Sequence, residues 1–293
     1  MLAGEVSPQA AAFLRFLIAS LLLLVLTYRA HGHLPRVTGR QMVGLVVLGL
    51  TGVVSYNLFF FKGLTLVSAG RASVIIANNP IMITLFAALF FREPLNIRKG
   101  IGVLVSVSGA IIAISKGDPL SLLSGGLGWG DALIFCCVLS WVAYTLVGKA
   151  VLAGLSPLVT VTYSAIIGTI GLAGPAIGAG LLGRMSGYEP VNWLCLGYLG
   201  IFGTVVGFIW YYEGVRTIGA ARASLFINFV PLGAIVMAFG FLGEPITLSL
   251  VVGTLLVISG VYITSVPAGS RRTIGGTPSA GPDQKPATPA LDV

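Results

Sequence analysis

The stretch GLTLVSAGRASVIIANNPIMITLFAALFFRE at residues 63–93 returns 151 residues later as GVRTIGAARASLFINFVPLGAIVMAFGFLGE at residues 214–244. The match continues outward from this stretch without a gap. The matched residues of the first copy are Leu48, Gly49, Gly52, Gly63, Ala69, Arg71, Ala72, Ser73, Pro80, Glu93, Pro94, Gly102 and Gly109, and those of the second are Leu199, Gly200, Gly203, Gly214, Ala220, Arg222, Ala223, Ser224, Pro231, Glu244, Pro245, Gly253 and Gly260. Two homologous apolar halves are typical of membrane folds with a central seam.

The composition excludes an ordinary soluble domain. Hydrophobic residues make up 56% of the chain, charged residues 9%, and the mean hydropathy is +0.98, whereas charged residues make up roughly a quarter of soluble domains. The net charge of +8 does not indicate nucleic-acid binding, because the basic residues lie singly in short loops. Cys136, Cys137 and Cys195 lie in apolar segments without metal-ligand spacing, so we interpret them as packing residues. We therefore predict an all-α polytopic membrane protein with no metal and no cofactor.

Nine segments are long and apolar enough to cross a bilayer, which needs roughly 20 residues per helix. They are approximately residues 9–28, 41–61, 71–91, 97–115, 129–149, 157–182, 193–212, 222–242 and 248–266. Beyond residue 266 the chain turns to Gly, Pro, Ala, Ser and Thr, which cannot bury a core. We predict that residues 267–293 form a disordered cytoplasmic tail.

The basic residues predict the orientation in the membrane. One set of alternate loops and segment ends carries twelve Lys and Arg residues, and the other set carries four, namely Lys62, Arg71, Lys116 and Arg184. Because loops rich in Lys and Arg stay in the cytoplasm, the C-terminus is predicted to be cytoplasmic.

The repeat predicts that one helix is missing. In the second half, segment 129–149 precedes Ser156-Pro157, whereas nothing precedes the matching Ser7-Pro8 of the first half. The chain therefore reads as a five-helix repeat used twice without its first helix. Either the start codon lies upstream or this is a nine-span variant. Because five is odd, consecutive repeats enter the membrane in opposite orientations, so we predict inverted halves.

Several short motifs resemble the EamA domain of the drug/metabolite transporter superfamily. The first half carries Ala12-Phe13-Leu14-Arg15-Phe16, Gly63-Leu64, Ser68-Ala69-Gly70-Arg71-Ala72-Ser73, Pro80, Glu93-Pro94, Gly102 and Gly109; the second half repeats the pattern and adds Trp141, Tyr144, Lys149 and Ser156-Pro157. The resemblance covers nearly everything from Ser7 to Ser265. It implies two inverted five-helix repeats, at residues 1–116 and 117–266, in an inner-membrane exporter of amino acids or other small metabolites. The missing first helix departs from that pattern.

Buried amides are the first candidates for a substrate cavity. Polar groups inside a span are costly unless they find a partner or water. The candidates are Asn57, Asn78, Asn79 and Asn228, and Pro80 and Pro231 lie beside them as predicted helix kinks. Two interpretations stay open: the amides line a cavity, or they bond neighbouring helices.

Aromatic residues are the second candidates. Trp141 and Tyr144 lie three residues apart and share a helix face, and with Tyr56, Trp210 and Tyr211 they could stack against apolar or zwitterionic metabolites. Tyr163 is a weaker candidate. Aromatics at span ends, namely Tyr28, Trp129, Trp193 and Tyr212, fit an interfacial belt instead.

The charged residues suggest no catalytic site. Glu93, Asp131, Glu213 and Glu244 lie at segment ends, and Glu93-Pro94 and Glu244-Pro245 fit helix-start turns. Arg15 lies two turns inside its span, and either its stem extends to the interface or it contacts a substrate carboxylate. Lys149 reads as an orientation signal. His31 and His33 share a basic loop and are a weak metal signal.

The leading hypothesis is a secondary transporter. The sequence contains no Gly-Lys-Ser/Thr phosphate-binding loop, so nothing in it indicates direct use of ATP. The expected partners are a small-molecule substrate and the lipid bilayer, with a homodimer left open and no nucleic acid. A membrane-embedded enzyme would need clustered acids, histidines or a nucleophile near one interface, and the sequence shows no such constellation, because its two histidines share a loop and its carboxylates are scattered. A non-transporting or truncated scaffold is the alternative that the missing helix keeps open.

Overall fold

The computed structural model describes residues 6–93, 95–115, 118–120, 128–229, 233 and 247–265. All regular structure in these ranges is helical. Seven helical segments there are long and apolar enough to cross a bilayer, and an eighth, Leu248–Thr264, is shorter. The chain is therefore an all-α, multi-pass membrane protein.

The first half contains four spans. They are α1 (Pro8–His31); α2 (Gly39–Leu48) continued through a π-helical segment at Gly49–Ser55 into α3 (Tyr56–Leu64); α4 (Ala69–Ile76) followed by α5 (Asn79–Phe91); and α6 (Ile97–Ile114). Ser7 caps α1 and Ser68 caps α4, because each side chain accepts a backbone N–H three residues on.

The second half begins with α8 (Trp129–Val151) and α9 (Pro157–Gly178). After α10 (Leu181–Arg184) and a 3₁₀ turn at Met185–Gly187, α11 (Pro190–Tyr198) continues through a π-helical segment at Leu199–Val206 into α12 (Gly207–Ile218). α13 (Ala220–Leu225), a 3₁₀ turn at Phe226–Asn228 and α15 (Leu248–Ser265) follow. The predicted span 222–242 lies mostly outside the described residues, as do Pro231, Glu244, Pro245 and the tail.

The two π-helical segments occupy equivalent places in the repeat. The N–H of Tyr56 donates to the carbonyl of Thr51, and the N–H of Gly207, 151 residues later, donates to that of Phe202. Both bonds run five residues back, which is the π-helical spacing. The repeat in the sequence therefore extends to an uncommon backbone geometry.

Glycines let these π-helical segments pack closely on the opposite half. A Cβ atom on Gly49 would lie 2.9 Å from the carbonyl oxygen of Ser164 in α9, and one on Gly200 would lie 3.0 Å from that of Arg15 in α1. Gly49 and Gly200 are repeat mates, as are Arg15 and Ser164 when Ser7-Pro8 is aligned with Ser156-Pro157. The two contacts are thus reciprocal between the halves.

A break in the helix immediately precedes Pro80. α4 ends at Ile76 and α5 begins at Asn79, with a turn between them. Proline has no N–H to donate back to the preceding turn. In the turn before it, the side-chain amide of Asn78 donates to the carbonyls of Val74 and Ile75, at 2.9 and 3.4 Å.

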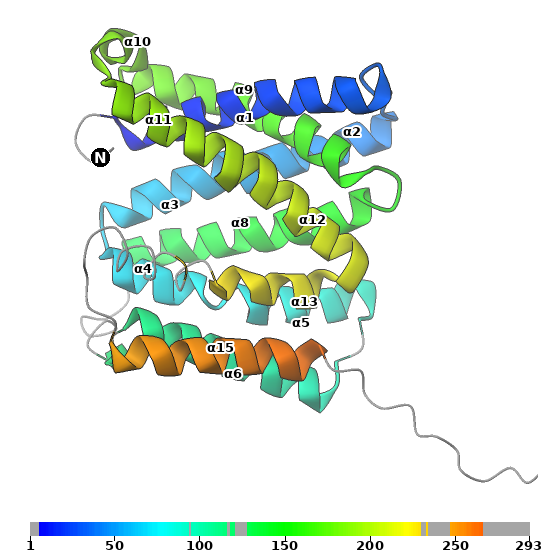
Figure 1. Cartoon of the computed structure of the whole chain (residues 1–293), viewed down its shortest axis with the longest axis vertical. Coiled ribbons are helices and arrows are strands. Elements are labelled where there is room, and N and C mark those ends of the chain that lie inside the picture. The colour runs from blue at the N-terminus through cyan, green and yellow to red at the C-terminus, as the bar shows by residue number, and fades with distance from the viewer. Residues whose placement is uncertain are drawn as a thin grey trace, which may run out of the picture.

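Figure 1 shows α8 in the middle of the bundle, between the α1 and α9 pair on one side and the α6 and α15 pair on the other. α8 contacts α3, α4, α5 and α12, which belong to both halves of the chain. This central helix carries the residues that follow.

Candidate functional site

An aromatic cluster lies around the middle of α8. Its members are Tyr56 from α3, Trp141 and Tyr144 from α8, and Phe208, Tyr211 and Tyr212 from α12. Trp141 is its hub, because the ring centroids of Tyr56, Tyr144 and Tyr211 lie 5.4, 5.3 and 5.4 Å from that of Trp141. These separations are typical of interacting aromatic rings. The cluster joins residues from both halves at mid-span.

Two glycines make room for the tyrosines of this cluster. A Cβ atom on Gly52 would overlap the Tyr144 ring, and one on Gly148 would overlap the Tyr212 phenol. Tyr144 and Tyr212 can therefore lie fully buried and stacked, with their centroids 4.9 Å apart. The prediction that Tyr212 belongs to an interfacial belt is wrong, because the packing of α12 on α8 turns its side chain inward.

Hydrogen bonds hold part of the cluster in place. The Tyr212 hydroxyl donates to the carbonyl of Tyr144 at 3.0 Å, and the Tyr211 and Thr145 hydroxyls lie 2.8 Å apart. By contrast, Trp141 Nε1 and the Tyr144 hydroxyl are buried and have no hydrogen-bond partner in the described structure. Buried polar atoms without partners are uncommon and costly. The cluster thus has unused hydrogen-bonding capacity.

Arg15 lies next to the cluster, beside the residue that follows Tyr56. Its Nη2 donates to Asn57 Oδ1 at 3.4 Å, and its guanidinium carbon lies 4.7 Å from the ring centroid of Phe16. Asn57, adjacent to Tyr56, is 3% exposed. Its Nδ2 donates to the carbonyl of Val53 at 2.6 Å, inside the π-helical segment. This bond orients the amide so that its oxygen faces the guanidinium.

Two ion pairs join the α4–α5 span to α8, one at each end of α8. Arg71 at the start of α4 binds Asp131 at the start of α8, with Nη2 2.8 Å from Oδ2 and a second contact from Nε to Oδ1. Glu93 after α5 binds Lys149 near the end of α8. The span formed by α4 and α5 therefore runs parallel to α8 and is joined to it at both ends.

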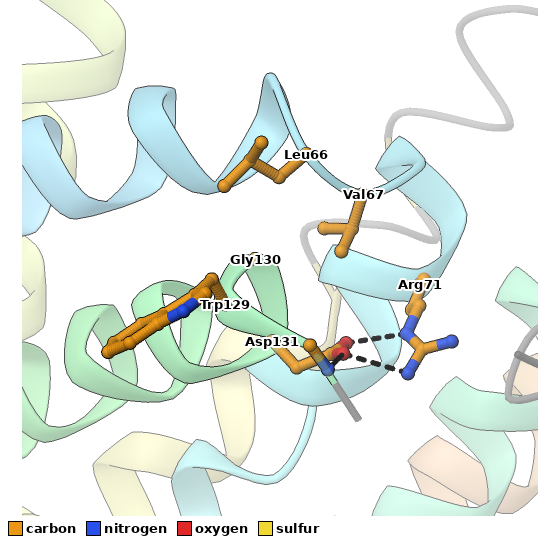
Figure 2. A pocket seen from close by; sticks show the side chains of 7 residues that line it. Leu66, Val67, Arg71, Trp129, Gly130 and Asp131 are labelled. Carbon is orange, nitrogen blue, oxygen red and sulfur yellow. Dashed lines mark hydrogen bonds and ion pairs between the residues drawn. The ribbon is translucent and has the colours of Figure 1, made fainter. Parts of the chain in front are cut away.

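The Arg71 and Asp131 pair borders a pocket of about 310 Å³, lined by Leu66, Val67, Arg71, Gly128, Trp129, Gly130 and Asp131. Figure 2 shows the Arg71 guanidinium directed at the Asp131 carboxylate, with the Trp129 side chain turned away from them. Trp129 is 83% exposed. The Asp131 carboxylate already accepts hydrogen bonds from Arg71 and from the N–H of Gly128. We therefore place this pocket at one end of the contact between the two halves and do not regard it as the substrate-binding site.

The other predicted site residues lie elsewhere. Trp210 is 73% exposed and faces away from the protein. The Tyr163 hydroxyl donates to the carbonyl of Pro35 at 2.8 Å, next to the loop after α1. Asn228 is buried and donates to Ser106 of α6 at 3.1 Å, a bond between helices. Asn79 is also buried, and its Oδ1 lacks a donor.

Sequence reasoning missed both ion pairs. The sequence suggests a turn at Glu93 and an orientation signal at Lys149, and nothing in the order of residues links two positions 56 residues apart. A signal was available: Arg71 begins one segment and Glu93 follows its end by two residues, while Asp131 lies near the start of segment 129–149 and Lys149 ends it. Phe208 was also missed, since nothing distinguishes it from the other apolar residues of its span.

Comparison with known proteins places the chain among transporters. The EamA-like transporter family matches residues 1–115 and 128–266. A solved crystal structure that is 17% identical superposes with a TM-score of 0.71 over 90% of this chain and 89% of the other, which supports the fold.

Three relatives carry transporter names. "Uncharacterized transporter YyaM" of Bacillus subtilis (strain 168) is 27% identical over 89% of this chain and 86% of its own. "Probable terminal-alkyne amino-acid exporter" of Streptantibioticus cattleyicolor is 31% identical over 89% and 83%. "Uncharacterized inner membrane transporter YicL" of Salmonella typhimurium is 26% identical over 92% and 88%.

Proposed function

Because the chain belongs to the EamA-like transporter family, we propose that it exports a small metabolite such as an amino acid by alternating access between two inverted repeats. The repeats are residues 1–116 and 117–266, and the membrane is the inner membrane with the C-terminus in the cytoplasm. The amino-acid exporter among the relatives supports the substrate class. The observation that carries the proposal is the partly unsatisfied aromatic and polar cluster in mid-span, with an ion pair at either end of its central helix.

Antiparallel pairing of equivalent helices supports the inversion. Gly102 packs on Gly260, and Gly109 on Gly253, although by the repeat Gly102 corresponds to Gly253 and Gly109 to Gly260. As the residue number rises along α6, that of its contact falls along α15. Antiparallel packing of equivalent helices is the arrangement that a two-fold axis in the membrane plane would produce, and it supports the proposed inversion.

The two ion pairs supply the closures that alternating access requires. In the proposed cycle, the Arg71 and Asp131 pair separates in the state open at its end, and the Glu93 and Lys149 pair separates in the other state. Partly exposed ion pairs contribute on the order of 1 kcal/mol, and conformational states in exchange differ by a few kcal/mol. Such contacts are therefore strong enough to bias the states and weak enough to release.

The aromatic cluster supplies the binding surface. Tyr56, Trp141 and Tyr211 present ring faces that suit an apolar side chain, while the free Trp141 Nε1–H suits a polar acceptor. The cluster lies between the two ion pairs along α8. A substrate bound there would be reachable from either side in turn.

Counterflow of labelled amino acids into liposomes containing the purified full chain tests this proposal. Trp141→Ala removes the hub of the cluster and should lower flux roughly tenfold, since aromatic contacts are worth about 0.5–1.5 kcal/mol beyond buried area. Asn79→Ala should lower flux as well if its unpaired amide lines the path. Flux is normalised to folded protein measured by size exclusion.

Trp210→Ala is the matched control, because it removes the same side chain from the exposed surface. Its flux should equal that of the wild type. Unchanged flux in Trp141→Ala would reject the aromatic cluster as the lining, and the absence of flux for every small solute tested would reject transport itself.

A further inference from the structure

Arg15 is a cation inside a membrane span, and no residue in the described part of the chain balances its charge. It lies in α1, seven residues or about 10 Å along the axis from the first residue of the helix. Its guanidinium is directed at the buried Asn57, and its Nε is itself buried. Charged side chains within a span are costly and are retained where they bind a partner or a substrate.

The hydrogen bonds of Arg15 leave most of its capacity unused. A guanidinium has five N–H donors. Within the described part of the chain, the guanidinium of Arg15 makes one hydrogen bond, from Nη2 to Asn57 Oδ1 at 3.4 Å. Its Nε is buried and has no acceptor there. An amide oxygen carries no charge, so the positive charge of Arg15 remains uncompensated there.

The other cations close to the seam differ from Arg15 in this respect. Arg71 has Asp131, and Lys149 has Glu93. No carboxylate in the described ranges lies within ion-pair distance of Arg15. Among the described residues, counter-ions thus lie at both ends of α8 and none lies at Arg15.

A second unsatisfied donor belongs to the same neighbourhood. Trp141 Nε1 is buried without an acceptor. Tyr56, adjacent to Asn57, has its ring 5.4 Å from that of Trp141, and Phe208 lies 5.9 Å from Phe16 and 5.7 Å from Trp141 between ring centroids. Both unsatisfied groups are donors. A ligand that supplies hydrogen-bond acceptors would therefore satisfy both groups.

From this we propose that Arg15 binds the carboxylate of the transported molecule, while Tyr56 and Trp141 contact its apolar part. The proposal rests on the transport function proposed above and adds a substrate class, namely small carboxylates with an apolar portion. Guanidinium and carboxylate match in a two-bond geometry and in charge. Bound substrate would supply the missing negative charge inside the protein.

The second repeat does not duplicate this group. The position equivalent to Arg15 is Ser164, whose hydroxyl donates to the carbonyl of Val161 at 3.1 Å. The carboxylate is therefore held from one half only. A substrate fixed on α1 at one end and on α8 by its apolar part would bridge the seam between the halves.

Matched ligands test the inference in the wild-type protein. Dissociation constants are measured by isothermal titration of the purified full chain with L-leucine, L-phenylalanine and other L-amino acids, each beside its carboxamide. Because hydrogen bonds to charged groups contribute about 1.5–3 kcal/mol, we expect the carboxylate to bind roughly 10- to 100-fold more tightly than the carboxamide.

Variants then assign the preference to one residue. Arg15→Gln should abolish the difference between carboxylate and carboxamide, and Arg15→Lys should restore part of it. Arg29→Gln, on the exposed end of the same helix, is the matched control and should behave as the wild type.

A wild-type protein that binds or transports carboxamides as well as carboxylates would overturn the assignment, and so would Arg15→Gln with an unchanged preference. This comparison in the wild type decides the matter even if Arg15→Gln fails to fold. Failure of every solute to be transported would instead reject the transport function, so the two failures are distinct.

Discussion

The α6 and α15 pair and the centre around α8 are built on opposite principles. The first joins four glycines, so that backbone packs on backbone; a Cβ atom on Gly109 would lie 2.6 Å from the carbonyl oxygen of Gly253. The second packs large aromatic rings, and no described residue supplies an acceptor to Trp141 Nε1 or Arg15 Nε. In a bilayer, close packing of small residues drives helix association. The glycine contacts between α6 and α15 therefore stabilise the fold. The centre retains polar capacity that packing alone does not require.

The largest expected effect comes from disrupting the glycine contacts between α6 and α15. In Gly260→Val the new Cβ atom would lie 2.5 Å from the carbonyl oxygen of Gly102 and from the amide nitrogen of Ser106. Both atoms are backbone and cannot rotate away. We expect a loss of about 3 kcal/mol in unfolding free energy, at the upper end of overpacking effects, measured by thermal unfolding in detergent micelles.

Gly100→Val in α6 is the control, because a Cβ atom there would meet nothing within 4 Å. It should change the unfolding free energy by less than about 1 kcal/mol. Equal effects of the two substitutions would mean that α6 and α15 do not meet at their glycines.

The second-largest expected effect comes from removing the ion pairs at the ends of α8. Their loss should shift the equilibrium between conformations more than it lowers the stability of the fold. Asp131→Asn and Glu93→Gln each remove one ion pair, at opposite ends of α8. If each pair closes one end, the loss should shift the balance between the two open states by about 1 kcal/mol, or several-fold in population.

The buried native residue Cys137 can report this shift. In a chain with Cys136→Ala and Cys195→Ala, labelling by a membrane-impermeant maleimide should rise from the Asp131 side in Asp131→Asn and from the Lys149 side in Glu93→Gln. Arg98→Gln, which alters an exposed charge at the start of α6, should leave labelling unchanged. A rise from the same side in both variants would contradict two separate closures.

The smallest effect tests the contact between α1 and α9. The Ser20 and Thr169 hydroxyls lie 2.9 Å apart, both buried. Ser20→Ala should lower the unfolding free energy by only about 0.6 kcal/mol, the mean for side-chain hydrogen bonds between membrane helices. A double-mutant cycle with Thr169→Val measures the coupling, and a value several times larger would show that hydroxyls as well as glycines hold the halves together.

The sequence anticipated much of the fold because its signals are local or periodic. Apolar length located α1, α6, α8 and α9 to within a few residues, and Pro80 located the break between α4 and α5. Tyr56, Asn57, Trp141, Tyr144 and Tyr211 were selected because polar or aromatic residues in mid-span are uncommon, and the structure gathers them around α8.

Other residues could not be assigned from the sequence, because neighbouring residues in a helix face different directions. Trp210, Tyr211 and Tyr212 are consecutive, yet Trp210 is 73% exposed and Tyr212 is fully buried. Only the packing of α12 on α8, with Gly148 making room for Tyr212, decides which ring enters the cluster. The same holds for Glu93 and Lys149, whose partnership depends on how two spans lie side by side.

The sequence by itself determined that this chain is helical, crosses a membrane and consists of two related halves, because hydropathy and repetition are properties of the chain order. Tertiary structure alone decided which charges pair at the ends of α8, which tyrosines stack, and that Arg15 lies beside Asn57 with no carboxylate of the described residues in ion-pair distance. The physical reason is that these contacts join residues 42 to 68 positions apart, and their energies depend on distance in space and not on distance along the chain.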